Sequence, residues 1–202
     1  NPHFIFNALN SIQSMINEKD HRNARYQLAK FSKLMRATLE HSREALIPLE
    51  EEITALNNYL SIEQMSRNNS FEFSITTQGD TDSETLLVPP MMIQPFVENA
   101  ILHGVAHIAH PGLIEVFFTR RNGFLECIVQ DNGIGRQKAS ELKSQVAHQH
   151  KSAALQVTQE RLAILNGPLS KSLQHLEISD RRSEEGVVVG TKVLLRLPIN
   201  DF

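Results

Sequence analysis

The spacing of apolar residues changes near residue 66, and this change restricts the folds open to the chain. Before it, apolar side chains recur every three or four residues, as they do on one face of a helix. Beyond it, segments such as FEFSIT at 71–76 alternate apolar and polar residues, as a half-buried strand does. The sequence therefore predicts two domains, a helical one over residues 1–66 and a mixed one over residues 67–202.

Three amphipathic helices are expected in the first domain. Their apolar positions are Ile5, Leu9, Ile12 and Ile16 in the first, Leu28, Phe31, Leu34, Met35 and Leu39 in the second, and Leu49, Ile53, Leu56 and Leu60 in the third. A polar stripe on another face of the first helix begins with His3 and Asn7. Three such helices make a thin core, so we expect a second copy to complete a helical bundle as a homodimer.

The second domain reads as strands punctuated by helices. The expected strands lie at 71–76, 113–118, 124–130, 173–179 and 193–198, and the expected helices at 91–104, about 136–147 and about 153–165. This order indicates helices covering one mixed sheet. The predicted fold class is therefore α+β, with a helical segment followed by a two-layer α/β sandwich.

The composition supports a folded chain and gives no support to a nucleic-acid partner. With 202 residues, 41% of them hydrophobic, the chain can bury a substantial core. Its 20 basic and 23 acidic side chains give a net charge of −3, so no nucleic-acid surface is expected. The single cysteine, Cys127, lies in the apolar run FLECIV and is expected to be buried and reduced, which is typical of a cytoplasmic protein.

The chain offers no candidate for a membrane-spanning helix. No stretch approaches the ~18 uninterrupted apolar residues that such a helix needs, and no signal peptide is visible. We therefore expect no direct membrane contact from these residues. Because the chain begins at Asn1 without a methionine, we expect it to be a piece of a larger protein, with any membrane segment upstream.

The segment PPMMIQPFVENAILHG carries helix signals and a polar pair. Pro95 suits a first helical turn, and His103 and Gly104 suit a last turn and its cap. These signals do not explain Glu98 and Asn99, which stand side by side among apolar residues. The pair could lie at an ordinary surface, or the Asn99 carboxamide oxygen could bind Mg²⁺, which takes few protein ligands beside phosphates and water.

The segment IVQDNGIGR has two interpretations. Asp-Asn-Gly after a strand is typical of a hairpin turn. Alternatively, Gly133 and Gly135 could let the backbone approach a flat ligand, with Asp131 presenting its carboxylate to an amino group such as that of adenine.

The segment HQHKSAALQV leads into the last expected helix. Ser152 is a suitable N-cap, and an exposed helix N-terminus beside Lys151 could bind phosphate. His148 and His150 could suggest a metal, but a solvated loop explains them as well.

The order of these motifs resembles the nucleotide-binding fold shared by histidine kinases, gyrase, Hsp90 and MutL. The opening NPHFIFNALNSI, followed by LEEEI, YLSIEQ, VPPMMIQPFVENAILHG and DNGIG, resembles the LytS-type sensor histidine kinases over essentially the whole chain. The resemblance implies ATP and Mg²⁺ as cofactors and His3 as the phosphoacceptor. It implies that Asn7 fixes the His3 imidazole and that Glu98 polarises it or orders the water around the metal.

The resemblance also assigns the nucleotide site. It implies that Asn99 holds Mg²⁺ on the phosphates and that Asp131 reads adenine. The remaining residues that it places at the nucleotide are His103, Gly104, Gly133, Gly135, Lys151, Ser152 and Thr191. One departure is the run Ser152-Ala153-Ala154-Leu155, where relatives carry a Gly-x-Gly-Leu-like lid. If the lid positions take positive φ, alanine there would be strained by ~1 kcal/mol and ATP binding would weaken. If the run is instead the start of a helix capped by Ser152, its N–H groups still point at phosphate and nothing is lost.

The activity implied by the resemblance is autophosphorylation of His3, followed by phosphoryl transfer to an aspartate of a response regulator. It implies a homodimer and the cytoplasmic region of a bacterial sensor anchored in the inner membrane. Two alternatives stay open. A scaffold of the same fold would bind partners without turnover, and a gyrase-like or Hsp90-like ATPase clamp would hydrolyse ATP with water.

Overall fold

The computed structural model describes residues 2–145, 158, 160–161 and 175–199. Its helices are α1 (Pro2–Asn17), α2 (His21–His41), α3 (Leu49–Ser66), α4 (Gln94–Asn99), the π-helix η1 (Ala100–Gly104), the 3-10 helix η2 (Val105–His107) and α5 (Arg136–Gln145). Its strands are β1 (Ile47–Pro48), β2 (Phe71–Gln78), β3 (Leu87–Val88), β4 (Gly112–Arg121), β5 (Phe124–Asp131), β6 (Leu176–Arg182) and β7 (Val188–Pro198).

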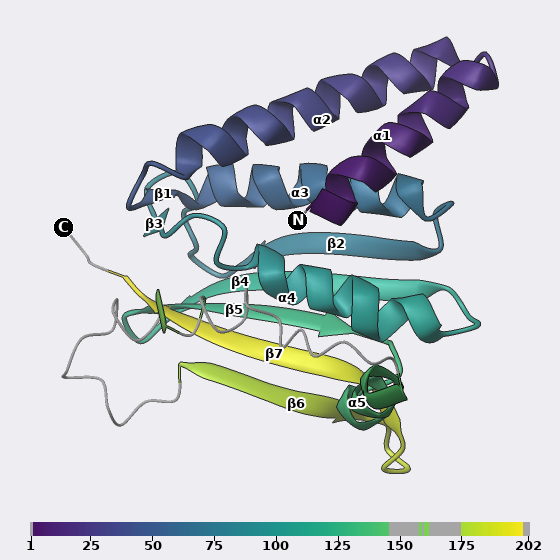
Figure 1. Ribbon diagram of the computed structural model, residues 1–202. Helices are drawn as coiled ribbons and strands as arrows, with labels where there is room; N and C mark the ends of the chain where they lie inside the picture. The colour runs from purple at the N-terminus through teal and green to yellow at the C-terminus, as the bar shows by residue number, and fades with distance from the viewer. Residues whose placement is uncertain (1, 146–157, 159, 162–174, 200–202) are drawn as a thin grey trace.

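The main sheet has five strands in the order β2-β4-β5-β7-β6. Strand β2 runs parallel to β4, and every other neighbouring pair is antiparallel, so the sheet is mixed as predicted. Helices α1, α2 and α3 lie beyond the β2 edge, and α4 crosses in front of the sheet (Figure 1). The α+β class and the helical layer against a mixed sheet are confirmed.

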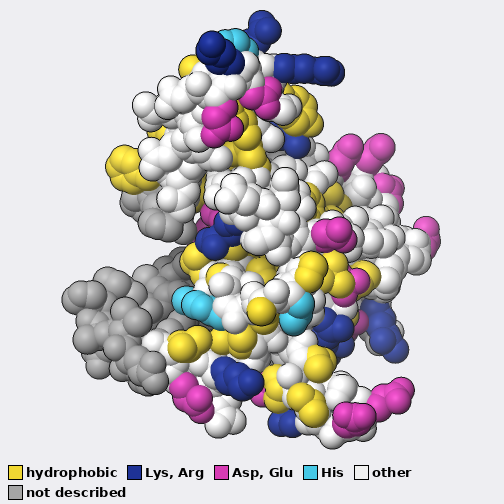
Figure 2. Space-filling view, turned by 90° about the vertical axis from the view of Figure 1, so that its right-hand side faces the viewer, with side chains coloured by type: hydrophobic (Ala, Val, Ile, Leu, Met, Phe, Trp, Pro, Cys, Tyr) yellow, Lys and Arg dark blue, Asp and Glu magenta, His cyan; other side chains and the backbone are white. Residues whose placement is uncertain are grey.

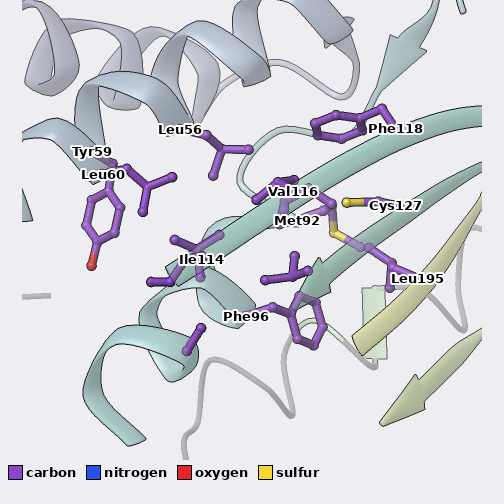
Figure 3. Packing of buried hydrophobic residues seen from close by; sticks show 14 of the residues in the cluster. Leu56, Tyr59, Leu60, Met92, Phe96, Ile114, Val116, Phe118, Cys127 and Leu195 are labelled. Atoms are coloured by element: carbon purple, nitrogen blue, oxygen red, sulfur yellow. The ribbon is translucent and has the colours of Figure 1, made fainter. Parts of the chain in front are cut away.

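The hydrophobic core lies between α3, α4 and one face of the sheet (Figure 3). Strands β4 and β5 alternate buried and half-buried residues, as sheets covered on one face do. Cys127 is buried in this core as predicted, and burial raises the pKa of its thiol. One buried cluster includes residues from both predicted domains, so the division at residue 66 stays a prediction.

The face that α1 buries within the chain differs from the predicted one. Phe4, Ala8 and Ile12 are buried, and Phe4 packs on Tyr59 of α3 with ring centroids 4.8 Å apart. The predicted row of Ile5, Leu9 and Ile16 is 37–49% exposed. Both rows repeat every three or four residues and share Ile12, so periodicity alone could not separate them.

The start of one predicted helix differs from the structure. The helix expected from residue 91 begins at Gln94, because Met91 adopts φ 57° and breaks the helical path. The helix expected over 153–165 falls largely outside the described residues, of which Thr158, Glu160 and Arg161 are helical. Within the described residues, no helix is both long and apolar enough to span a membrane.

Candidate functional site

The buried face of β5 ends in a carboxylate. Its core-facing side chains are apolar until the last, Asp131, which is only 4% exposed. Its Oδ1 accepts backbone N–H bonds from Gly133 at 2.8 Å and from Thr191 at 3.2 Å. Burial raises the pKa of this carboxyl, and the two N–H donors oppose that rise. A buried carboxylate is costly without hydrogen-bond partners. Strand alternation alone therefore does not explain an aspartate at this core position.

Three glycines let backbone pack directly around Asp131. A Cβ on Gly104 would lie 2.9 Å from the Asp131 carboxyl carbon, and one on Gly190 would lie 1.9 Å from the Asp131 carbonyl oxygen. A Cβ on Gly133 would lie 2.3 Å from the carbonyl carbon of Gly104. Gly133 therefore serves packing between the end of β5 and η1, and its predicted approach to a nucleotide stays a prediction.

Replacing Gly190 with alanine is expected to lower the free energy of unfolding by more than about 2 kcal/mol, because the new Cβ would overlap backbone at φ 144°. The matched control is Gly186→Ala. Gly186 has φ 79° but no atom within 4 Å of an added Cβ, so only backbone strain of about 1 kcal/mol is expected. Urea unfolding of both variants measures the difference, and equal losses would contradict the close approach at Asp131.

The hairpin interpretation of Asp-Asn-Gly is wrong. Strand β5 leads into α5 and pairs with β4 and β7, so no hairpin connects at this point. The second glycine explains the difference, because Gly135 takes φ 78° and turns the chain toward α5. Asp180 of β6 stabilises this turn, because its side chain accepts a hydrogen bond from the Arg136 N–H at 2.9 Å.

Two residues that support the site were not predicted. Arg181 of β6 donates to the Asp131 carbonyl oxygen at 2.9 Å. Asn132 accepts the Leu113 N–H at 2.7 Å and donates to the Pro111 carbonyl at 3.1 Å, which fixes the end of β5 against the start of β4. The Asp-Asn-Gly motif contains Asn132 and could have pointed to it. Arg181 lies in a strand rich in polar residues and belongs to no motif.

The polar pair of α4 is half-buried. Glu98 accepts a side-chain bond from Gln94 at 3.0 Å, and Asn99 is the last residue of α4. Pro95 stands in the first turn as predicted. A π-helix follows Asn99 directly, and such turns are frequent at functional sites.

Gly104 does not end this helix as a left-handed cap. Its φ is −96°, and the helical path continues into η2. The predicted cap is therefore wrong, and the close contact with Asp131 gives the physical reason for this glycine. His103, one residue earlier, is half-buried.

Gly104 joins the two parts of the site. It is the last residue of η1, which follows α4 directly, and it packs against Asp131 at the end of β5. The stretch bearing Asn99 is thereby brought to the turn that bears Gly133, beside Thr191 of β7. On the side of the molecule where β5 ends, acidic, basic, histidine and hydrophobic side chains are interspersed (Figure 2).

Several predicted residues cannot be placed by their side chains. His3 lies in the first turn of α1, next to the buried Phe4, but its side chain is outside the described part. Asn7 is half-buried one turn further along. Lys151 and Ser152, with the run that departs from the lid pattern, lie outside the described residues, as do His148 and His150.

Glu98 and Asn99 carry side-chain oxygens, the ligand type that magnesium takes in proteins. No group of three or more histidine, cysteine or acidic side chains that could hold a metal occurs among the described residues. A half-buried carboxamide beside a half-buried carboxylate offers one or two hard oxygen ligands. That is the protein share of a Mg²⁺ site completed by phosphates and water.

This arrangement of helices and mixed sheet is that of the histidine kinases. The chain is similar in fold to the histidine kinase domain of the blue-light activated histidine kinase EL346 from Erythrobacter litoralis, with a TM-score of 0.53 at 13% identity. The match covers 98% of this chain and 93% of that one. The sequence model of the histidine kinase family matches residues 1–71.

Sequence relatives show to which group of histidine kinases the chain belongs. The chain is 33% identical over 181 residues to the sensor protein LytS of Bacillus cereus, which covers 88% of this chain. It is 34% identical over 138 residues, 68% of the chain, to the sensor histidine kinase/phosphatase LytS of Staphylococcus aureus. The chain belongs to the LytS-type sensor histidine kinases, and it spans about 30% of the length of the Bacillus cereus protein.

Proposed function

We propose that this chain is the ATP-dependent kinase region of a LytS-type sensor, which phosphorylates itself on His3 and passes the phosphoryl group to an aspartate of a response regulator. One observation carries the nucleotide part of the proposal. Asp131 is a buried carboxylate whose two N–H partners both bind Oδ1. Neither of these two bonds uses Oδ2, so Oδ2 would be the atom that accepts a ligand donor such as the amino group of adenine.

The proposed reaction uses residues from two regions, the start of α1 and the end of α4. A neutral imidazole is nucleophilic near pH 7, so a ring nitrogen of His3 attacks the γ-phosphorus and the bond to the β,γ-bridging oxygen breaks, releasing ADP. Asn99 would hold Mg²⁺, which neutralises phosphate charge when bound. Glu98, beside Asn99, would accept hydrogen bonds from the imidazole or from metal-bound water.

The phosphate side of the site completes the assignment. His103 and Gly104 would lie near the phosphates, with Lys151 and Ser152 supplying a charge and helix N–H groups. Thr191 would border the adenine, because its N–H already holds the carboxylate of Asp131.

The proposed unit is a homodimer of two-domain chains, with residues 1–66 carrying the phosphoacceptor and residues 67–202 the nucleotide. A row of apolar side chains on the first two helices supports the dimer: Ile5, Phe6, Leu9, Ile16, Leu28 and Leu39 are 37–69% exposed. Burying such a row against a second copy removes apolar area from water. We place this region in the cytoplasm, as part of a sensor anchored in the inner membrane, and the relatives named as sensor proteins support the sensor role.

The two alternatives differ from the kinase in what they require. An ATPase clamp has no need of the helical segment, whereas the histidine kinase family matches residues 1–71. A scaffold without turnover has no need of the phosphoacceptor His3 or of Asn99 as a metal ligand, and both residues are present. Both observations favour the kinase.

Incubation with ATP labelled on the γ-phosphate separates the three functions. The kinase predicts label on the protein that is lost in acid and retained in base, as a phosphohistidine is. Free labelled phosphate alone would indicate the clamp. Bound nucleotide without labelled protein or free phosphate would indicate the scaffold.

A further inference from the structure

The first turn of α3 contains three successive glutamates, of which one is buried. Glu50 and Glu51 are exposed, whereas Glu52 is only 2% exposed. Burial raises the pKa of the Glu52 carboxyl, and backbone N–H groups and His41 oppose the rise. A buried carboxylate is costly unless it is bonded, so its partners show what it does.

Those partners lie on the loop that enters α4. Oε2 of Glu52 accepts the Met91 N–H at 2.9 Å, and Oε1 accepts the Ile93 N–H at 3.4 Å. The Ile93 carbonyl in turn accepts the Phe96 N–H at 3.0 Å, which starts the helix. Glu52 therefore binds the backbone of the α4 N-cap residue directly.

Helix α4 lacks the groups that usually fix its start. Ile93 offers no side-chain cap, and the first turn contains no acidic residue. The first N–H groups of a helix have no partner within it. Glu52, 41 positions earlier in the chain than Ile93, supplies both the acceptor and the negative charge.

The same loop holds a strained residue. Met91 has φ 57°, a left-handed conformation that side chains other than glycine rarely adopt. Such a conformation persists only where its surroundings fix it. Glu52 holds Met91 on one side, and Arg161 holds the neighbouring Pro90 carbonyl at 3.1 Å on the other.

The loop that enters α4 therefore connects the helices of residues 1–66 to the candidate site. Glu51, adjacent to Glu52, pairs with His41 at the end of α2 at 2.8 Å. Just after this loop, Gln94 at the start of α4 donates a hydrogen bond to Glu98 at 3.0 Å. The end of α2 and the start of α4 therefore meet at the first turn of α3.

We propose that Glu52 is a positioning residue that caps α4 from α3 and so fixes Glu98 and Asn99 for phosphoryl transfer. The proposal rests on the proposed kinase function, because only a reaction at α4 gives this position a catalytic consequence. A helix of six residues spans about 9 Å, so an error at its start is carried to Asn99. Small misplacements of reacting groups reduce rates strongly.

The test compares Glu52→Gln with Glu50→Gln in the full chain. Both changes remove one negative charge from the same turn, but Glu50 is exposed. Glutamine offers one acceptor oxygen, and its NH₂ group would face an N–H, so Glu52→Gln loses one of the two bonds. Hydrogen exchange of the 91–97 amides reports the cap, and the rate of phosphohistidine formation at saturating Mg·ATP reports the positioning.

We expect Glu52→Gln to speed exchange at 91–97 and to slow phosphohistidine formation, each by about tenfold. Measured well below the melting temperature, the rate per folded molecule would not change if Glu52 only stabilised the fold. Glu50→Gln should match the wild type in both. Unchanged exchange in Glu52→Gln would overturn the cap, and faster exchange with an unchanged rate would overturn the positioning.

A second variant decides the matter if Glu52→Gln folds poorly. Glycine adopts φ 57° without strain, so Met91→Gly in the Glu52→Gln background should restore folding and part of the rate. No restoration would contradict the role of Glu52 at this loop. A wild-type chain that forms no phosphohistidine would instead refute the kinase function, while the exchange comparison would still decide the cap.

Discussion

Replacing His3 with glutamine should abolish acid-labile labelling of the chain, with a fall of at least about 100-fold in phosphate incorporation. Glutamine has similar size and polarity but no nucleophilic nitrogen. The change lies in the first turn of α1, whereas Asp131 lies at the end of β5, so nucleotide affinity should stay within about twofold of the wild type. Labelling with γ-labelled ATP and a nucleotide titration measure the two quantities.

His21 provides the matched control for this change. It is an exposed histidine at the start of α2, so His21→Gln should label as the wild type does. Loss of labelling in both variants would point to general damage to the helical segment. Full labelling of His3→Gln would place the phosphoacceptor elsewhere.

Replacing Asp131 with asparagine should weaken ATP binding by about 100-fold. The asparagine oxygen can keep the N–H bonds of Gly133 and Thr191, which places its NH₂ group where Oδ2 now stands. Two N–H donors, that NH₂ group and the adenine amino group, would then face each other. Titrations with ATP and GTP measure the effect, and the preference for ATP should disappear.

Asp80→Asn is the control for Asp131→Asn, because Asp80 is an exposed aspartate. Thermal unfolding should accompany both titrations, since Asp131 also fastens the backbone around it. Wild-type affinity in Asp131→Asn would remove this carboxylate from the nucleotide site.

Periodicity predicted the order of elements well because it depends on local spacing. The helices of residues 1–66 and the strands of the mixed sheet follow the expected pattern. It could not decide which row of α1 is buried, because the rows through Phe4 and through Ile5 have the same spacing. That choice depends on aromatic partners in α2 and α3, which are distant in sequence.

The candidate site was predictable where motifs are compact. Asp131, Gly133 and Gly135 lie within or beside one turn, so the sequence could point to them. Arg181 and Glu52 contact the site over 50 and about 40 positions of the chain, and neither has a motif of its own. The triple glutamate in particular looks like an ordinary helix start, and only burial separates Glu52 from its neighbours.

The proposed function requires that the end of β5 and the end of α4 together bind a magnesium nucleotide. A crystal structure of the chain with a non-hydrolysable ATP analogue at millimolar magnesium tests this binding most directly. We expect the adenine amino group within hydrogen-bond distance of Asp131 Oδ2 and the metal bound by the Asn99 carboxamide oxygen. A nucleotide bound away from both residues, or none bound at millimolar concentration, would contradict it.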